Sequence, residues 1–215
     1  MKIAALTDHH FTPSSRFRVR SHISFLRKNG IYVADLTRLC STQTSGLLFP
    51  TKKLRNSLPK LAAASFFEVA NICQTFARVC FSNYFEATWI SRQIINNYPS
   101  FEMLVKKPII YDIDDAVYLA TKANSGILFL IQNAAVVFAG NSYLAEYCRQ
   151  RNSNVHIVPT AVDVNRFMPN TQKKKSKDMI IGWSGTSSSY KYFSPIVDSI
   201  AKFLKGKSNI RLSFF

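Results

Sequence analysis

The sequence predicts an α/β protein built on a parallel β-sheet, and three features of the chain predict it. Short apolar runs alternate with helical patterns in the order strand, helix, strand, which is the βαβ arrangement. Hydrophobic residues make up 47% of the chain, enough for a full core. One apolar run, residues 108–111, leads directly into Asp112, Asp114 and Asp115. Open α/β sheets bind ligands at the carboxyl ends of such strands, so we expect function there.

The length and charge limit the class of protein. At 215 residues the chain fits one large domain, or one domain plus part of another. The net charge of +16 implies an anionic partner: a phosphorylated small molecule, nucleic acid or an anionic membrane surface. The four cysteines, Cys40, Cys73, Cys80 and Cys148, have neither CxxC nor metal-ligand spacing and fit reduced thiols in the cytoplasm.

No segment has the pattern of a membrane span or a signal peptide. The apolar run at residues 3–6 is too short for a signal peptide. The longest apolar stretch, residues 126–140, is interrupted by Gln132 and Asn133 and is too short to cross a bilayer. The prediction is a soluble, cytoplasmic protein, with peripheral contact at the inner face of the cell membrane as a further option.

The first βαβ unit occupies the N-terminal end of the chain. Residues 2–7 are predicted as a strand, residues 8–15 as a turn and residues 31–36 as a second strand. Between them, Ser14 or Ser15 caps a helix that continues to about Asn29, where Gly30 ends it.

The turn after the first strand offers groups that suit an anion. No GxGxxG motif follows the strand, so a dinucleotide cofactor is disfavoured. Ser15, Arg16 and Arg18 instead place a hydroxyl and two guanidinium groups at a helix N-terminus. The alternative is a basic, solvated helix face, to which we assign Arg20.

The middle of the chain continues the alternation. Residues 51–81 form a basic, amphipathic helical region that Pro59 is expected to break; it covers the sheet or, alternatively, lies on an anionic membrane. The remaining predictions are a loop at 40–50, strands at 85–91, 108–111, 134–139 and 154–158, and helices at 94–104, at 126–133 and from Asn141 or Ser142 to about Gln150.

The acidic cluster after residue 111 stands out from a basic chain. Three of the twelve acidic residues, Asp112, Asp114 and Asp115, lie within four positions, and no Lys or Arg lies between Pro108 and Thr121. Like charges this close repel, which a sequence tolerates where carboxylates meet a partner or do chemistry. The alternative is that one Asp caps the next helix and the others are solvated. Asp112 and Asp114 also have the Asp-x-Asp spacing that can hold Mg²⁺ or Mn²⁺ against a diphosphate.

A domain boundary is predicted near residue 168. We place a first domain at residues 1–168, a lysine-rich linker at 169–178 and a second domain beginning at 179–215. The second part holds a strand at 179–183, a turn at 184–189, a helix at 190–204 and a strand at 209–215. One βαβ unit of about forty residues is too small for its own core, so we expect the second domain to be incomplete.

An ordered series of motifs resembles the family 4 (group 1) glycosyltransferases of the GT-B fold. The series runs over most of the chain: Pro13-Ser-Ser-Arg-Phe-Arg-Val19, Ile110-Tyr-Asp-Ile-Asp-Asp-Ala116, Ala139-Gly-Asn-Ser-Tyr-Leu-Ala145, Val158-Pro-Thr-Ala-Val-Asp163 and Ile181-Gly-Trp-Ser-Gly-Thr186. The resemblance implies two Rossmann-like domains facing across a cleft, the first holding an acceptor and the second a nucleotide sugar.

The resemblance also implies roles for particular residues. Asp112, Asp114 and Asp115 would orient the acceptor hydroxyl or the donor sugar. Ser15, Arg16, Arg18 and Asn141 would bind the acceptor or another anion. A strand, a small-residue turn and a helix suit phosphate, and the loop that would face the donor phosphates contains Gly182, Gly185, Thr186 and Ser187.

The implied reaction is transfer of a sugar from a nucleotide-sugar donor to a glycan or lipid-linked acceptor, with retention at the anomeric carbon and without a metal or cofactor. The pathway would be cell-surface polysaccharide or glycoconjugate synthesis. Many members carry a His near the Asp cluster, and the family's paired acidic residues of the second domain lie beyond this sequence. We therefore expect weak donor binding or inactivity of this chain alone.

Three alternatives stay open. Mg²⁺ or Mn²⁺ could bind at Asp112 and Asp114. The chain could also be a truncated, inactive remnant, or a non-catalytic module that binds an anion or a membrane surface. Nucleic acid is disfavoured, because the sequence has no RNP, zinc-finger or helix-turn-helix pattern.

Overall fold

The computed structural model describes residues 1–10, 12–38, 58–92, 94, 101–120, 125–169, 179–185 and 189–214, with side chains from residue 69 onward in the segment that begins at 58. The predicted loop at 40–50 and most of the predicted helix at 94–104 lie outside these residues. The chain divides into two compact units, Met1–Arg166 (unit 1) and Phe167–Phe215 (unit 2). The sequence placed the end of the first domain at residue 168.

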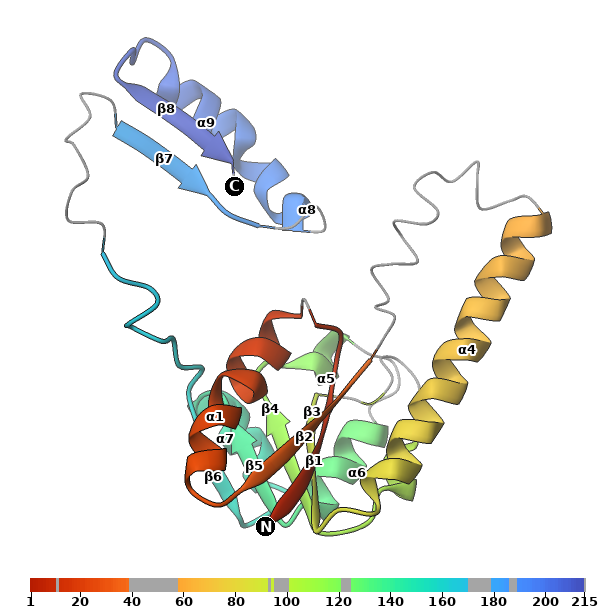
Figure 1. Ribbon diagram of the computed structural model, residues 1–215. Coiled ribbons are helices and arrows are strands. Elements are labelled where there is room, and N and C mark those ends of the chain that lie inside the picture. Colours follow the sequence, from red (N-terminus) through yellow and green to blue (C-terminus); the bar gives the residue numbers. More distant parts are fainter. Residues whose placement is uncertain are drawn as a thin grey trace. The chain divides into compact units, whose positions relative to one another are not determined.

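Unit 1 is built on a six-stranded sheet in which every neighbouring pair is parallel (Figure 1). The strand order is β2-β1-β3-β4-β5-β6. The predicted α/β class and parallel sheet are confirmed, and the arrangement is Rossmann-like. The strands are β1 (Lys2–Thr7), β2 (Tyr32–Thr37), β3 (Ala87–Ser91), β4 (Ile109–Ile113), β5 (Val136–Ala139) and β6 (Val155–Ile157).

The reversal of strand order between β1 and β3 decides which helices cover which face. Right-handed crossovers put the β1–β2 connection on one face and the later connections on the other. In Figure 1, α1 and α4 accordingly lie on opposite sides of the sheet. Among the described residues of unit 1, the helices are η1 (Ser15–Arg20), α1 (Ser21–Lys28), α4 (Leu58–Ser82), η2 (Phe101–Leu104), α5 (Val117–Ala120), α6 (Ser125–Asn133) and α7 (Ser142–Arg149).

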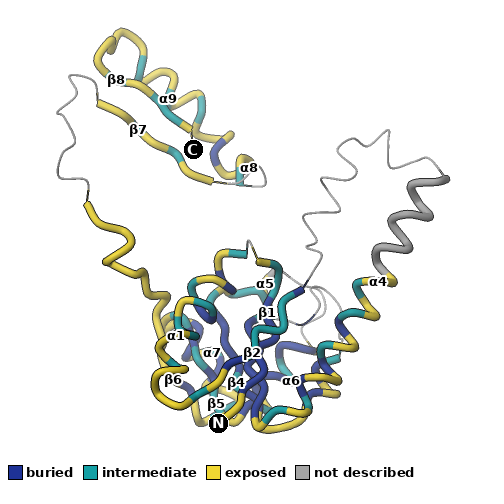
Figure 2. The backbone as a smooth tube through the Cα atoms, in the orientation of Figure 1, coloured by how far each residue is buried: buried dark blue, intermediate teal, exposed yellow. Residues whose placement is uncertain are grey.

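Each face of the sheet has its own apolar cluster. Under η1 and α1, Val19 packs with Ile3 and Trp89, joined by Ile23 and Leu26. The larger cluster on the other face brings together side chains of β3, β4 and β5 with α4, α6 and α7. Its fully buried members include Ile90, Ile109, Tyr111, Ile113, Leu130, Val137 and Leu144. Figure 2 shows that the buried parts of unit 1 gather along the central strands of the sheet.

Two predicted helices differ in detail. Pro59 was expected to break a helix, but α4 runs from Leu58 to Ser82 with Pro59 in its first turn. Proline is tolerated there because the first N–H groups of a helix have no partner within the helix. The predicted helix after β1 begins with a π-helical segment, Ser15–Arg20, in which Ser15, Arg18 and Val19 are all buried. The wider turn therefore directs Arg18 into the protein together with its apolar neighbour.

Unit 2 is a small βαβ unit. Strands β7 (Met179–Trp183) and β8 (Ile210–Phe214) pair in parallel. The predicted helix at 190–204 is divided into α8 (Tyr190–Phe193), the 3₁₀ turn η4 (Ser194–Ile196) and α9 (Val197–Leu204), with Pro195 at the start of η4. Phe193 packs against Trp183 and Phe214 at centroid distances of 5.3 and 5.1 Å. Among the residues described in unit 2, it is the only one that is buried.

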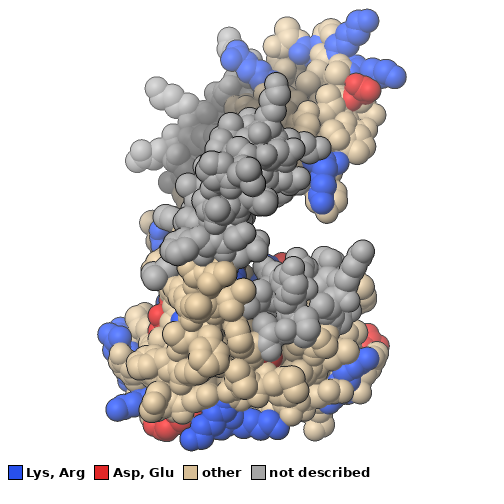
Figure 3. Space-filling model, turned by 90° about the vertical axis from the view of Figure 1, so that its right-hand side faces the viewer, with Lys and Arg blue, Asp and Glu red and all other residues tan. Residues whose placement is uncertain are grey.

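The helices, the cysteines and the surface charge bear on the predictions of no membrane span, reduced thiols and an anionic partner. Within the described ranges no helix is long and apolar enough to cross a membrane. Cys73, Cys80 and Cys148 are free thiols, and Cys40 lies outside the described residues. On the face drawn in Figure 3, lysine and arginine side chains are spread over several parts of the surface. The excess positive charge by itself therefore does not mark one binding site on that face.

Replacing Leu130 with Ala tests the larger cluster. Leu130 is fully buried, so Leu130→Ala should lower the free energy of unfolding by about 2–5 kcal/mol through lost burial and the cavity left behind. Leu119→Ala is the control, since Leu119 is 72% exposed and should change stability little. Urea unfolding followed by circular dichroism measures both. Equal effects of the two changes would contradict this account of the core.

Candidate functional site: the carboxyl edge of the unit 1 sheet

The carboxyl ends of β1, β3, β4 and β5 form one edge of the sheet, because all of these strands are parallel. The strand order reverses between β1 and β3, and this is where doubly wound sheets open a crevice. Charged residues follow three of these strands: Asp8 after β1, Arg92 after β3, and Asp114 and Asp115 after β4. This edge is the candidate site.

Arg18 and Asp112 form a buried ion pair at the edge. Arg18 Nε and Nη2 donate to Asp112 Oδ1 at 3.0 and 2.5 Å, and Nε also reaches Oδ2 at 3.3 Å. Both side chains are 2% exposed. Burial raises the pKa of Asp112 to about 6, although the hydrogen bonds and charge of Arg18 oppose the rise. These two predicted site residues therefore bond to each other.

Arg18 also reaches a third segment of the chain. Its Nη1 donates to the carbonyl oxygen of Val158, just after β6. One guanidinium group thus joins the π-helical turn after β1, the end of β4 and the chain that leaves β6. Arg18 and Asp112 therefore hold together the three segments that form this part of the edge.

Arg92 pairs with the two other carboxylates of the acidic cluster, Asp114 and Asp115. Its Nε donates to Asp114 Oδ1 at 3.0 Å, and its Nη2 donates to Asp115 Oδ2. Burial alone would lower the pKa of Arg92, but the charges of Asp114 and Asp115 raise it overall. The Asp115 side chain is 64% exposed and that of Asp114 is 14% exposed. Asp115 is therefore the carboxylate most open to a ligand, with Asp114 partly open.

Arg92 has an unusual backbone. Its φ of +66° lies in the left-handed region, which is costly for a residue with a side chain. Its backbone N–H donates to the carbonyl oxygen of Asp112 at 3.0 Å, extending the pairing of β3 with β4 by one residue. This hydrogen bond fixes the point from which the Arg92 side chain reaches Asp114 and Asp115.

The turn after β5 lies against the acidic turn. The N–H of Gly140 donates to the carbonyl oxygen of Ile113 at 2.8 Å, and a Cβ at Gly140 would stand 3.2 Å from the Cα of Asp114. A side chain would therefore press on the acidic turn. Asn141 caps α7, as predicted: its side chain accepts a hydrogen bond from the N–H of Leu144 at 2.9 Å.

The predicted anion-binding turn after β1 is occupied by internal contacts. Ser15 is buried, and its Oγ accepts a hydrogen bond from the N–H of Asp8 at 3.1 Å. Arg16 is exposed and lies 4.4 Å from the ring centre of Phe17. Arg16 is therefore the residue of this predicted group that solvent reaches.

Arg20 was assigned to a solvated helix face, and this prediction is wrong. Its Nε lies 2.5 Å from Asp35 Oδ2, with both side chains about 15% exposed. Its Nη2 also donates to the hydroxyls of Thr7 and Thr37 at 3.1 and 3.2 Å. Arg20 therefore ties the ends of β1 and β2 together.

The predicted donor loop belongs to unit 2. Gly182 lies within β7, opposite Ser213 of β8. A Cβ at Gly185 would lie 2.7 Å from two ring atoms of Trp183, so the indole packs over this glycine. This packing by itself accounts for a glycine at position 185, and the phosphate-binding role stays a prediction. Thr186 and Ser187 lie outside the described residues.

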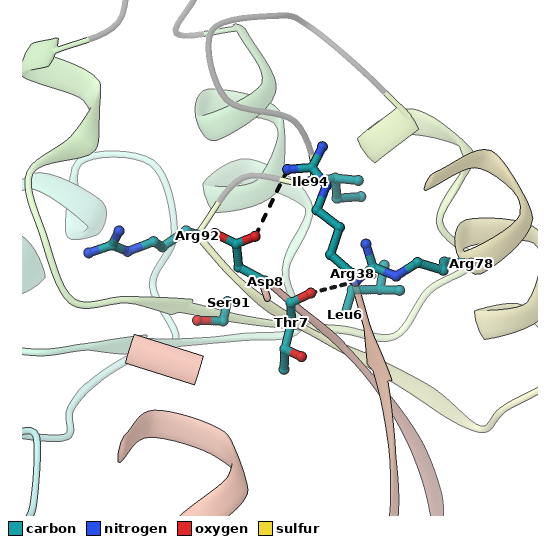
Figure 4. Close-up of a pocket in the computed structure, with 8 residues that line it drawn as sticks. All are labelled: Leu6, Thr7, Asp8, Arg38, Arg78, Ser91, Arg92 and Ile94. Carbon is teal, nitrogen blue, oxygen red and sulfur yellow. Dashed lines mark hydrogen bonds and ion pairs between the residues drawn. The ribbon is translucent and has the colours of Figure 1, made fainter. Parts of the chain in front are cut away.

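A small pocket opens between the ends of β1 and β3, where the strand order reverses (Figure 4). Its enclosed part is just large enough for one water molecule, and it opens to solvent. Sequence reasoning did not select any of its arginines as site residues. The pocket is lined by Leu6, Thr7, Asp8, Arg38, Arg78, Ser91, Arg92 and Ile94.

The described residues contain no group of three His, Cys, Asp or Glu side chains that could hold a metal ion. The Asp-x-Asp spacing of Asp112 and Asp114 does not present two carboxylates to one cation, because Asp112 is bonded to Arg18. This geometry disfavours the Mg²⁺ or Mn²⁺ alternative at that pair.

No protein-family model matches the chain, and a search of curated proteins finds no match. Fold and site together define an α/β protein with a Rossmann-like parallel sheet, whose carboxyl edge carries buried and half-buried ion pairs.

The Arg18–Asp112 pair predicts a pH dependence of stability. The pKa of Asp112 is about 6 in the folded chain and 3.8 as the ordinary value, so the folded state binds more protons between these pH values. Asp112 therefore contributes about 3 kcal/mol to the free energy of unfolding below about pH 4. This contribution is lost as the pH rises to about 6. Asp112→Asn lacks this loss.

The measurement is urea unfolding of the wild type and Asp112→Asn from pH 4 to pH 7. The wild type should lose stability relative to the variant as pH rises. Asp163→Asn, at an exposed carboxylate, should keep the wild-type profile. A wild type that gains stability relative to Asp112→Asn would show that the attraction of Arg18 outweighs desolvation.

Proposed function

We propose that the chain is part of a retaining glycosyltransferase, which transfers a sugar from a nucleotide-sugar donor to a glycan or lipid-linked acceptor. Unit 1 would hold the acceptor and unit 2 would contribute to donor binding. The observation that carries this proposal is the contact set of Arg18. Arg18 belongs to the first motif of the glycosyltransferase-like series, and it bonds to Asp112 of the second motif and to Val158 of the fourth.

A second contact supports the proposal. Gly140 of the third motif lies directly against Asp114 of the second. Four motifs that are far apart in sequence therefore meet at one edge of the sheet, the edge at which such sheets bind ligands.

The edge also fixes which carboxylates we assign to chemistry. Asp112 is bonded to Arg18, so we assign it to positioning. Arg92 holds the carboxyl groups of Asp114 and Asp115 in place, and a carboxylate accepts a hydrogen bond from a sugar hydroxyl. We propose that Asp115, supported by Asp114, orients the acceptor hydroxyl for attack at the anomeric carbon.

The donor side rests on the resemblance. The diphosphate leaving group needs positive charge or backbone N–H groups. In this proposal the turn that follows β7 supplies the N–H groups and a basic residue such as Arg16 or Lys191 supplies the charge. No metal is needed in this scheme. We place the activity in cell-surface polysaccharide or glycoconjugate synthesis, at the cytoplasmic side of the membrane.

Changing both open carboxylates tests this function. Asp114→Asn with Asp115→Asn keeps the size of the side chains but removes the charges that orient the hydroxyl. Transfer by the full-length enzyme, measured as nucleoside diphosphate released in the presence of a glycan or lipid-linked acceptor, should fall by about 100-fold. Glu146→Gln is the control, because it removes an exposed carboxylate of the same unit on α7.

Binding is measured in parallel by thermal shift against a panel of nucleotide sugars, since a ligand that binds the folded chain raises its melting temperature. In the full-length enzyme, at least one donor should raise the melting temperature of the wild type and of Glu146→Gln. A panel without any such shift for the full-length enzyme, or wild-type transfer by the double variant, would contradict the proposal.

A further inference from the structure

The ion pairs along the edge leave one place with an excess of positive charge. Arg18 pairs with Asp112, Arg20 with Asp35, and Arg92 with two carboxylates. In the pocket between β1 and β3, by contrast, Arg38 and Arg78 share a single lining carboxylate. This is Asp8, whose Oδ1 lies 4.0 Å from Arg38 Nη1. Figure 4 shows the Arg92 side chain pointing away from both of these arginines.

Arg78 is held in place by the backbone. It comes from α4, and it donates from Nε to the carbonyl oxygen of Leu36 at 2.7 Å and from Nη2 to that of Thr7 at 2.5 Å. Burial, followed by the charge of Arg38, lowers the pKa of Arg78 to about 10, so Arg78 stays charged at neutral pH. The pocket is therefore lined by a buried cation, Arg38, and a half-buried one, Arg78, and an anion bound beside them would relieve their repulsion.

Arg38 retains an unsatisfied donor. The residue is 6% exposed, and within the described part of the chain its Nε has no hydrogen-bond partner. Leaving a buried guanidinium donor without a partner is costly. At the neighbouring strand end, Ser91 adds a hydroxyl to the lining. The pocket thus combines an unused charged donor, a second cation and a hydroxyl.

The size of the pocket limits what can enter. Its enclosed part is about as large as one water molecule, so it admits an oxygen atom but not a base or a sugar ring. A terminal phosphoryl oxygen fits this description, because it is small and charged and has further oxygens that remain at the open mouth. Arginine forks and hydroxyls are groups that bind phosphate.

We propose that this pocket binds the terminal phosphate group of a ligand through Arg38 and Arg78, and that this ligand is the acceptor of the proposed transfer. The identity of the ligand as an acceptor rests on the proposed function; the phosphate site does not. The pocket lies where the strand order reverses between β1 and β3, on the same edge of the sheet as Asp114 and Asp115. An acceptor held there by its phosphate would have its hydroxyl-bearing end free to reach those carboxylates.

The test is isothermal titration calorimetry of the full chain with inorganic pyrophosphate at low ionic strength. The wild type should bind one pyrophosphate, and Arg38→Gln should weaken binding by about tenfold or more, since one charged hydrogen bond is lost. Arg27→Gln is the matched control: it removes the same charge from an exposed position on α1 and should leave the affinity unchanged.

Equal affinities for wild type and Arg38→Gln would overturn the site, and so would equal losses in Arg38→Gln and Arg27→Gln, which would indicate diffuse attraction only. If Arg38→Gln does not fold, Ser91→Ala tests whether the pocket binds pyrophosphate, because this variant keeps every arginine. It should weaken pyrophosphate binding, and unchanged affinity would count against the site. Absence of binding to the wild type would also overturn the proposal.

The source of the phosphate is resolved by two further titrations. Glycerol 3-phosphate represents a free phosphorylated acceptor, and phosphatidylcholine vesicles containing phosphatidic acid represent a lipid headgroup. Binding of either that is weakened by Arg38→Gln supports the site and names its source. Failure of both to bind in an Arg38-dependent way overturns the assignment to an acceptor.

The phosphate site and the proposed function can fail separately. Pyrophosphate binding that depends on Arg38, without any transfer of sugar, would keep the site and remove the glycosyltransferase. Transfer that is unaffected by Arg38→Gln, with pyrophosphate affinity also unchanged, would keep the enzyme and remove the site.

Discussion

The buried ion pair of Arg18 and Asp112 is the contact on which the carboxyl edge depends. It joins the π-helical turn after β1 to β4, and through Val158 it also holds the chain that leaves β6. Burying two charges is expensive, and here burial outweighs attraction strongly enough to raise the pKa of Asp112. A pair of this kind does more for the unique placement of segments than for stability. Fixing β4 in turn fixes the acidic turn that follows it.

Much of the fold could be predicted from the sequence, because its signals are local. Apolar runs bounded by turns marked the strands of the sheet, and Asn141 marked the start of α7 through its ordinary capping chemistry. What was missed depends on context. Proline breaks a helix only away from its first turn, and the sequence does not show where α4 begins. The π-helical turn at Ser15–Arg20 has no local signal; it is explained by a partner at Asp112.

The candidate site was predicted in position but not in its charge balance. The acidic cluster has no basic residue near it in sequence, so it looked unneutralised. Its basic partners come from distant parts of the sequence. Arg92 follows β3, and Arg18 lies 94 positions before Asp112. Arg92 directly follows a predicted strand, and this is the signal that would have suggested it, since parallel strand ends meet at one edge. Arg38 and Arg78 had no such signal, because the approach of α4 to β1 and β2 is a tertiary contact.

A double-mutant cycle on Arg18 and Asp112 tests most directly whether their buried ion pair holds the carboxyl edge together. Arg18→Met and Asp112→Leu each leave one buried charged partner alone, whereas the two changes together remove both charges. Urea unfolding of the four proteins at pH 7 gives the coupling free energy. We expect the coupling free energy between Arg18 and Asp112 to be well above about 1 kcal/mol, and the double variant to be more stable than either single variant. Additive losses would mean that the two residues act independently and that the edge is held by something else.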